Sequence, residues 1–201
     1  MPSSRQEPRA EVDRGGRPAL TSAHHLADVA QELFLERGFE QTTIDDIARA
    51  AGVSRRTFFR YFSTKADVLW VESPAEIGRF RELLADAPPD EHYADALCRA
   101  APDALQHAPE ERTWALHRAQ LLLSVPSVQE KAAVRYTEWR EIATKFVADR
   151  RGTRTDDLFA IGAGHAVLAA TVGAHEYWIA HEDEELPDIL VRLLRLLVPR
   201  G

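Results

Sequence analysis

The stretch from residue 43 to residue 65 constrains the fold of this chain more than any other part of the sequence. Two short runs with helical spacing meet there at Gly52, whose missing side chain permits a tight turn. Thr43 is placed to cap the first run, and Asp46 follows three residues later as in a capping box. Ser54 is placed to cap the second run, RRTFFRYF. The pattern predicts a helix-turn-helix, an arrangement that can read the major groove of DNA.

The second run carries charge that suits a polyanion. Residues 54–65 contain four cations and no acid, although the whole chain has a net charge of −7. Residues 1–70 hold 10 of the 25 Lys and Arg and 10 of the 32 Asp and Glu, which leaves 15 cations against 22 acids in residues 71–201. Because DNA affinity depends on local neutralisation of phosphates, a basic face on an acidic body is compatible with DNA binding.

Helical spacing continues on both sides of this stretch, with no strand alternation and no internal repeat. Proline or glycine separates most of the expected helices, which cover 22–37, 66–70, 73–87, 91–106, 109–124, 127–150, 155–180 and 187–198. We therefore predict an all-α fold. Its parts are an N-terminal arm (1–20), a three-helix DNA-binding domain (21–68) and a helical body (69–201).

Composition adds three expectations. Residues 1–20, rich in Pro and Gly and without a helical stripe, are expected to be a disordered arm that is either inert or inserts Arg14 and Arg17 into a minor groove. The single Cys98 cannot form an intrachain disulfide, and no signal peptide is evident, so a cytoplasmic location is expected. The uncharged stretch 158–175 is rich in Ala and Gly, which predicts a buried helix rather than a membrane span.

The sequence TTIDDIARAAGVSRRTFFRYFSTK, at positions 42–65, resembles the DNA-binding signature of TetR-family bacterial transcriptional regulators. The similarity extends back to Leu26 and forward to Leu69, about a quarter of the chain. It implies that Arg55, Arg56, Thr57 and Arg60 face the major groove. The two-pronged donor geometry of arginine suits both guanine and phosphate, so the sequence leaves open which arginine reads a base.

Further DNA contacts follow from the same resemblance. Thr43 and Ser54 are candidate contacts in addition to their capping roles, and Tyr61 and Lys65 resemble phosphate clamps. Phe59 occupies a position that is often tyrosine in this signature. Because phenylalanine has no hydroxyl group to bond a phosphate, Phe59 is expected to contact a thymine methyl group or a sugar instead.

The resemblance also implies a homodimer that binds a near-palindromic operator and releases it when a small molecule enters the body. The candidate dimer helices are the last two, where small residues and leucines form stripes at Gly162, Ala166, Ala169, Gly173, Leu190, Leu194 and Leu197. Candidate ligand-lining residues are Trp114, His117, Leu121, Tyr136, Trp139, Phe146, His165 and Trp178. Internal core packing is the alternative for both sets. Arg118, Arg135 and Arg140 are expected on the solvated surface unless an anionic ligand meets them.

The segment from Arg55 to Trp70 also resembles regulators associated with mycofactocin loci, some of which respond to long-chain acyl-CoA, so an acyl or amphipathic ligand is one expectation. A small helical enzyme and a helical adaptor are the alternative classes. His175-Glu176 begins like a zinc-protease motif, but Ile179 stands where the second histidine ligand belongs. We therefore predict a TetR-like repressor with no catalytic residues, no metal, no cofactor and no membrane partner.

Overall fold

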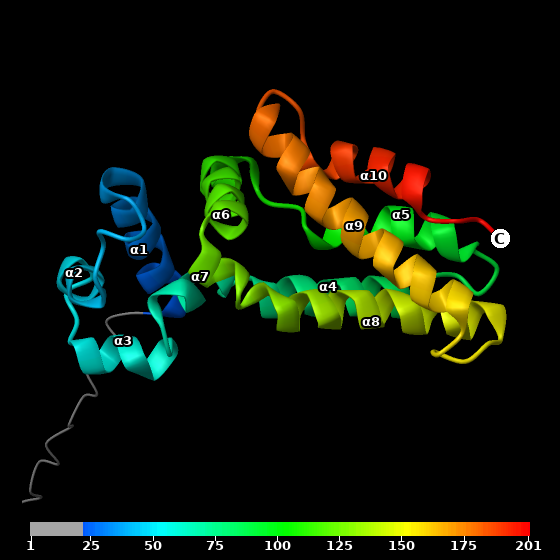
Figure 1. Cartoon of the computed structure of the whole chain (residues 1–201), viewed down its shortest axis with the longest axis horizontal. Helices are drawn as coiled ribbons and strands as arrows, with labels where there is room; N and C mark the ends of the chain where they lie inside the picture. The colour runs from blue at the N-terminus through cyan, green and yellow to red at the C-terminus, as the bar shows by residue number, and fades with distance from the viewer. Residues whose placement is uncertain (1–21) are drawn as a thin grey trace, which may run out of the picture.

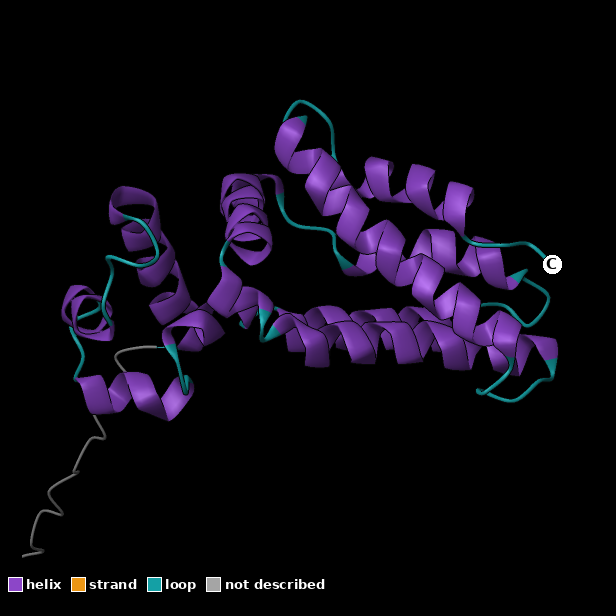
Figure 2. Ribbon diagram, in the orientation of Figure 1, coloured by secondary structure: helices purple, strands orange, loops and turns teal. Residues whose placement is uncertain are grey.

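The computed structural model describes residues 22–201, and over these residues it consists of helices joined by loops (Figure 2). The elements are α1 (Ala23–Arg37), α2 (Ile44–Ala50), α3 (Arg55–Tyr61), η1 (Lys65–Trp70), α4 (Ser73–Ala85), α5 (Tyr93–Ala104), η2 (Pro109–Glu111), α6 (Arg112–Ser124), α7 (Pro126–Gln129), α8 (Ala132–Arg151), α9 (Leu158–Ala180) and α10 (Leu186–Leu197). The all-α prediction is confirmed for this part of the chain. The predicted arm, with Arg14 and Arg17, lies outside the described residues.

Hydrogen bonds at the helix ends confirm the predicted capping of the helix-turn-helix. The Thr43 hydroxyl accepts from the backbone N–H of Asp46 at 3.1 Å, and the Asp46 carboxylate accepts from the backbone N–H of Thr43 at 3.0 Å. At the next helix, the Ser54 hydroxyl accepts from the backbone N–H of Thr57 at 3.1 Å. Between the two helices Gly52 has a φ of +66°, a left-handed conformation that costs glycine little. The local sequence therefore sets the angle between α2 and α3.

Three expected helices differ from the structure. The helix expected over 109–124 begins with a separate 3-10 helix, η2, and α6 begins at Arg112. The segment 66–70 is a 3-10 helix, η1, and the single helix expected over 127–150 was wrong, because α7 ends at Gln129 and α8 begins at Ala132. Pro126 begins α7, a position where its missing N–H leaves no hydrogen bond unmade. Val128 of α7 is fully buried and packs in the same core as Leu26 of α1.

The described residues, 22–201, form two cores. The first lies under α1, α2 and α3 around Leu26, Ile47 and Phe58, and residues of α6 and α7 complete it. The second lies between α4, α5, α8, α9 and α10, where the rings of Phe80 and Trp139 stack 4.2 Å apart. In Figure 1 the first group forms a compact head at one end of the elongated body, with α6 and α7 between them. Leu69 and Trp70, just beyond the predicted boundary at residue 68, also pack in the first core.

Helix α9 is the longest helix in the described part of the chain, and by length and composition it is apolar enough to cross a membrane. In the structure it packs between α8 and α10 (Figure 1). Only 33% of its most apolar window is buried within the chain, so the expectation of a buried helix holds for one face only. The remaining face is exposed.

Gly164 lets α8 and α9 approach closely. A Cβ atom at this position would lie 2.9 Å from the backbone oxygen of Arg140 and would clash with the Thr144 hydroxyl. We expect Gly164→Ala to lower the free energy of unfolding by about 1–3 kcal/mol, because a backbone group cannot move aside as a flexible side chain can. Gly78→Ala in α4 is the matched control, since no atom lies within 4 Å of a Cβ there. Urea denaturation measures both, and equal losses would contradict this explanation.

Candidate nucleic-acid interface and ligand cavity

The outward face of α3 gathers the predicted DNA-reading side chains. Arg56, Thr57, Phe59 and Arg60 line a concavity on the surface of the head. Phe59 is 44% exposed, whereas its neighbour Phe58 is fully buried in the first core. The exposed ring of Phe59 thus lies among the cations Arg56 and Arg60 on this face. Four of the nine side chains that the sequence assigned to DNA are therefore brought together on one face.

The three arginines of α3 differ in their surroundings. Arg55 pairs with Asp45 of α2 at 2.8 Å, with both side chains more than half exposed. Arg60 lies over the ring of Tyr61 at 5.0 Å and donates to its hydroxyl at 3.2 Å. Within residues 22–201 the Arg56 guanidinium has no hydrogen-bond or ion-pair partner, and it is exposed. Arg56 is consequently the arginine that can meet DNA without first breaking a contact.

Other predicted contacts have roles within the head. Both Lys65 and Thr43 use their polar groups inside the protein: Lys65 Nζ donates to the carbonyl oxygens of Phe39 and Thr42 at 2.5 and 3.0 Å, and the Thr43 hydroxyl donates to Asp46 at 2.5 Å. Burial lowers the pKa of Lys65, with Glu40 acting in the opposite direction. Lys65 therefore holds the loop before α2, and at most one of its three N–H groups is left for a phosphate.

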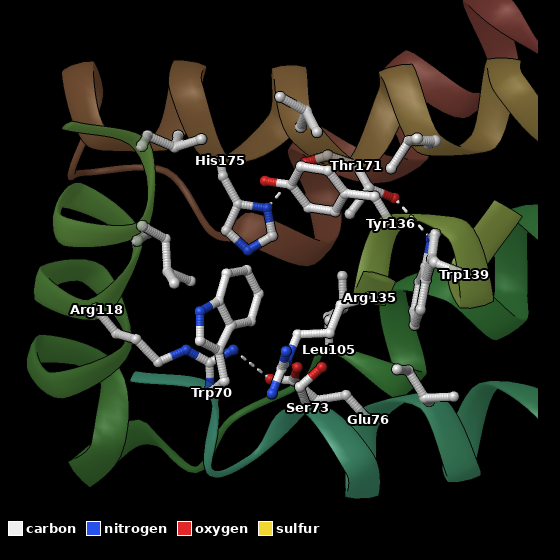
Figure 3. A pocket seen from close by; sticks show the side chains of 16 residues that line it. Trp70, Ser73, Glu76, Leu105, Arg118, Arg135, Tyr136, Trp139, Thr171 and His175 are labelled. Atoms are coloured by element: carbon white, nitrogen blue, oxygen red, sulfur yellow. Dashed lines mark hydrogen bonds and ion pairs between the residues drawn. The ribbon is translucent and has the colours of Figure 1, made fainter. Parts of the chain in front are cut away.

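A cavity in the body lies between α4, α6, α8 and α9 (Figure 3). The space among its lining side chains, including the part open to solvent, is about 630 Å³. Its apolar lining consists of Ile77, Leu105, Ala119, Leu122, Leu123, Trp139, Leu168 and Val172, together with the ring of Tyr136. In the part of the chain that the structure describes, no group of three His, Cys, Asp or Glu side chains is placed to hold a metal ion.

Two of the eight predicted ligand-lining residues, Tyr136 and Trp139, line this cavity, and the other six do not. Leu121 packs in the first core, and Trp178 is buried with its indole N–H donated to the backbone of Glu184. The remaining four are Trp114, His117, Phe146 and His165, which lie outside the lining. The helical spacing of these aromatic residues reflects core packing and surface positions, and these six residues do not line this cavity.

The polar lining was largely missed from the sequence. Arg118 and Arg135, expected at the solvated surface, both line the cavity, whereas Arg140 does not. Arg118 is 5% exposed and donates to the Glu76 carboxylate at 2.6 Å. His175 Nδ1 donates to the carbonyl oxygen of Thr171, 2.8 Å away. A buried arginine is hard to recognise in sequence because its partner, Glu76, is 42 residues away on another helix.

The charges around this ion pair shift one another's protonation. Burial alone would raise the pKa of Glu76, but the guanidinium of Arg118 outweighs it, so the pKa is lowered. Burial lowers the pKa of His107 to about 4, and Arg118 adds to the effect. Burial likewise lowers the pKa of His175. At neutral pH the cluster thus holds an ionised Glu76, a cationic Arg118 and neutral histidines.

This arrangement predicts that acid destabilises the fold through His107. Because the pKa of His107 falls from 6.5 to about 4 on folding, the unfolded chain binds more protons between these values. Stability should therefore be fully present above pH 6.5 and decline as the pH falls toward 4. We expect the free energy of unfolding to be about 1–2 kcal/mol lower at pH 5 than at pH 7. Urea denaturation of the wild type and His107→Gln measures this loss, and an equal loss in both proteins would contradict the assignment to His107.

The predicted dimer residues separate into two groups. Leu190 and Leu194 are fully buried in the second core, so their assignment to a dimer interface was wrong. Gly173 lies against Leu193 of α10 within the same chain, and Ala166 is half-buried against the second core. An exposed face does remain on α9 and at the end of α10, formed by Leu158, Ile161, Gly162, His165, Ala169, Leu196 and Leu197.

Comparisons with known proteins agree with this architecture. Residues 26–69 match the family model described as bacterial regulatory proteins of the tetR family, and residues 91–200 match the MftR C-terminal domain. The chain is 36% identical over 178 residues to the mycofactocin biosynthesis transcriptional regulator MftR of Mycobacterium tuberculosis, covering 88% of this chain and 89% of that protein. It is 30% identical to the regulator TcmR of Streptomyces glaucescens, over 79% of this chain and 72% of that one.

A solved structure with a related sequence is the Thermus thermophilus repressor FadR in complex with lauroyl-CoA. It is 26% identical to this chain, with a TM-score of 0.59, and the match covers 88% of this chain and 93% of FadR. The similarity thus extends over the head and the body together.

Proposed function

The chain belongs to the TetR family of bacterial transcriptional regulators, and from this premise we propose that it is a homodimeric repressor whose operator is released by a small amphipathic ligand. The observation that carries the proposal is the outward face of α3, where three arginines and an exposed aromatic ring lie on a segment without acids. The names of the relatives, all transcriptional regulators, favour this function over the small enzyme and the adaptor.

On this proposal α3 lies in the major groove. Arg56 and Arg60 donate to base edges or phosphates, and Thr57 and Phe59 contact the groove between them. Arg55 also contacts the DNA once its ion pair with Asp45 is broken, while Ser54 and Thr43 act mainly as helix caps. Tyr61 contacts the sugar-phosphate backbone of the DNA through its hydroxyl group, which Arg60 orients. Lys65 supports the loop before α2 and retains one N–H group for a phosphate.

The exposed face of α9 supports dimerisation. Ile161, His165 and Ala169 recur at four-residue spacing, so they lie along one face of the helix, and Gly162 beside them leaves room for another helix. An exposed apolar strip of this kind is costly in water unless a partner covers it. A second copy of the chain, related by a two-fold axis, would cover it and place two α3 helices on successive half-sites of one palindrome.

The cavity supports an amphipathic ligand, because an apolar wall surrounds a small polar group of side chains. The related FadR of Thermus thermophilus was solved with lauroyl-CoA, which supports an acyl ligand for this chain. Trp70 links the cavity to the head, since its ring packs in the first core and also lines the cavity. Asp67 of the same 3-10 helix pairs with Lys131 beside α8 at 3.1 Å. A ligand that displaces Trp70 or α8 therefore moves the head.

Selection of bound sequences from random duplex DNA tests the proposal. The expected result is a near-palindrome whose half-site centres lie about 10 base pairs, or a multiple of that, apart. Affinity for the recovered duplex should fall linearly with the logarithm of salt concentration, with a slope of about −0.9 for each phosphate contacted. No enriched sequence, or affinity that does not change with salt, would favour the adaptor instead.

A further inference from the structure

Two donors in the cavity lack an acceptor in the described part of the chain. Arg118 uses Nη2 to bond Glu76, but its buried Nη1 has no hydrogen-bond partner. The indole Nε1 of Trp70 is also buried without a partner. Both side chains are more than nine-tenths buried, and both line the cavity. A buried donor without an acceptor costs about 1–3 kcal/mol, so two in one cavity favour a ligand that supplies acceptor atoms.

The unpaired donors lie at the polar end of the cavity. Figure 3 shows the indole nitrogen of Trp70 on the side of the ring nearer Arg118, with Glu76, Ser73 and the Arg135 guanidinium below it. The apolar side chains continue from this end along α8 and α9 toward Trp139. A ligand with a polar head and an apolar chain therefore fits in one orientation.

The charged side chains that line the cavity indicate which kind of polar head group the ligand carries. Arg118 and Arg135 bring two positive charges to the lining and Glu76 one negative charge, while the pKa of His175 is lowered by burial and its ring is neutral. Arg135 lies 4.9 Å over the ring of Trp70 and donates a hydrogen bond to the Lys131 carbonyl. The cavity thus has a net positive charge, which favours an oxygen acceptor and disfavours a cation.

We infer that the polar end of the cavity is a subsite for the acyl oxygen of the ligand, bound by the donors of Trp70 and Arg118 and balanced by the charge of Arg135. This inference rests on the proposed ligand-responsive function and adds the chemistry by which the ligand is selected. A carboxylate and the carbonyl of an acyl ester or thioester both offer this oxygen. The apolar chain lies against Leu168, Val172 and Trp139.

Calorimetric titration of the full-length protein with three twelve-carbon probes tests the subsite, each below its critical micelle concentration. Laurate carries an anionic acceptor, methyl laurate a neutral acceptor, and dodecyltrimethylammonium a cation without an acceptor. Laurate and methyl laurate are expected to bind, and dodecyltrimethylammonium at least about 100-fold more weakly. Equal binding of the cationic probe would overturn the inference.

Two variants locate the binding in named residues. Trp70→Phe removes the N–H and keeps a ring, so it should weaken laurate by about ten-fold, the usual loss for a hydrogen bond to a charged group. Trp114→Phe is the matched control, because Trp114 has another buried, unpaired indole N–H but does not line the cavity. It should leave laurate binding unchanged. Unchanged laurate affinity in a folded Trp70→Phe protein would overturn the subsite.

Arg135→Met distinguishes the two sources of the oxygen. Because Arg135 is only half-buried, this variant is expected to fold, so the test holds even where Trp70→Phe does not fold. A ten-fold loss for laurate alone identifies a carboxylate, whereas an equal, smaller loss for both acyl probes identifies a neutral carbonyl. Binding without release of the selected operator would keep the subsite and contradict the release mechanism. Release of the operator by the cationic probe alone would contradict the subsite and keep the release mechanism.

Discussion

Simultaneous replacement of Arg55, Arg56 and Arg60 by alanine is expected to lower affinity for the selected operator by at least about 100-fold and to leave the proposed dimer intact. A good arginine contact to a base edge contributes about 1–3 kcal/mol, and six guanidinium groups are lost per dimer. All three side chains are exposed, so their loss removes no core packing. Fluorescence anisotropy with labelled duplex measures the affinity, and sedimentation measures the oligomeric state.

The single variants are expected to differ because the surroundings of the arginines differ. Arg56→Ala should have the largest effect, since Arg56 is unpaired within residues 22–201 and contacts DNA at no internal cost. Arg55→Ala should have the smallest, since Arg55 must first leave Asp45, which partly neutralises it. Asp45→Asn should therefore tighten binding to DNA of any sequence.

A matched triple variant controls for net charge. Arg81 of α4, Lys145 of α8 and Arg154 of the loop after α8 are exposed cations of the body, and their replacement by alanine removes the same formal charge. This control should bind the operator within about two-fold of the wild type at physiological salt, because charges beyond a Debye length are screened. An equal loss in both triple variants would mean that net charge, and not the α3 face, determines affinity.

The head was predictable from sequence because its determinants are local. Thr43, Gly52 and Ser54 act on neighbours within a few residues, so their roles as caps and turn are visible in the sequence, and the structure confirms them. The exposed side of α3 follows from the same local spacing once Phe58 is assigned to the core. The internal bonds of Lys65 are different, since they reach 26 and 23 residues back along the chain.

The cavity was not predictable in this way, because its lining comes from helices that are far apart in the sequence, from Trp70 of η1 to His175 of α9. Aromatic residues at helical spacing on α6, α8 and α9 satisfied the same pattern whether they faced the core, solvent or the cavity. Leu190 and Leu194 show the same ambiguity, since a leucine stripe on α10 suits a dimer interface as well as the second core that buries it. The polar lining was missed for the same reason, because Arg118 and Glu76 pair across two helices that are 42 residues apart in the sequence.

Breaking that buried pair should destabilise the fold more than Gly164→Ala does. Arg118→Met keeps most of the side-chain volume but leaves the carboxylate of Glu76, which is 5% exposed, without its partner. We expect the free energy of unfolding to fall by about 3–5 kcal/mol, the usual cost of an uncompensated buried charge. Chemical denaturation at pH 7 measures the change.

The double variant Glu76→Gln/Arg118→Met separates loss of the partner from loss of packing. Because it removes both charges, it should recover most of the stability lost in Arg118→Met. The pH dependence gives a second check. Without Arg118, the pKa of the buried Glu76 is raised above its unfolded value, so the penalty is present at neutral pH and fades as the pH falls through the folded pKa. Relative to wild type, Arg118→Met should therefore recover stability between pH 7 and pH 5. A double variant as unstable as the single one, with no recovery in acid, would show that Arg118 stabilises the body by packing rather than by its charge.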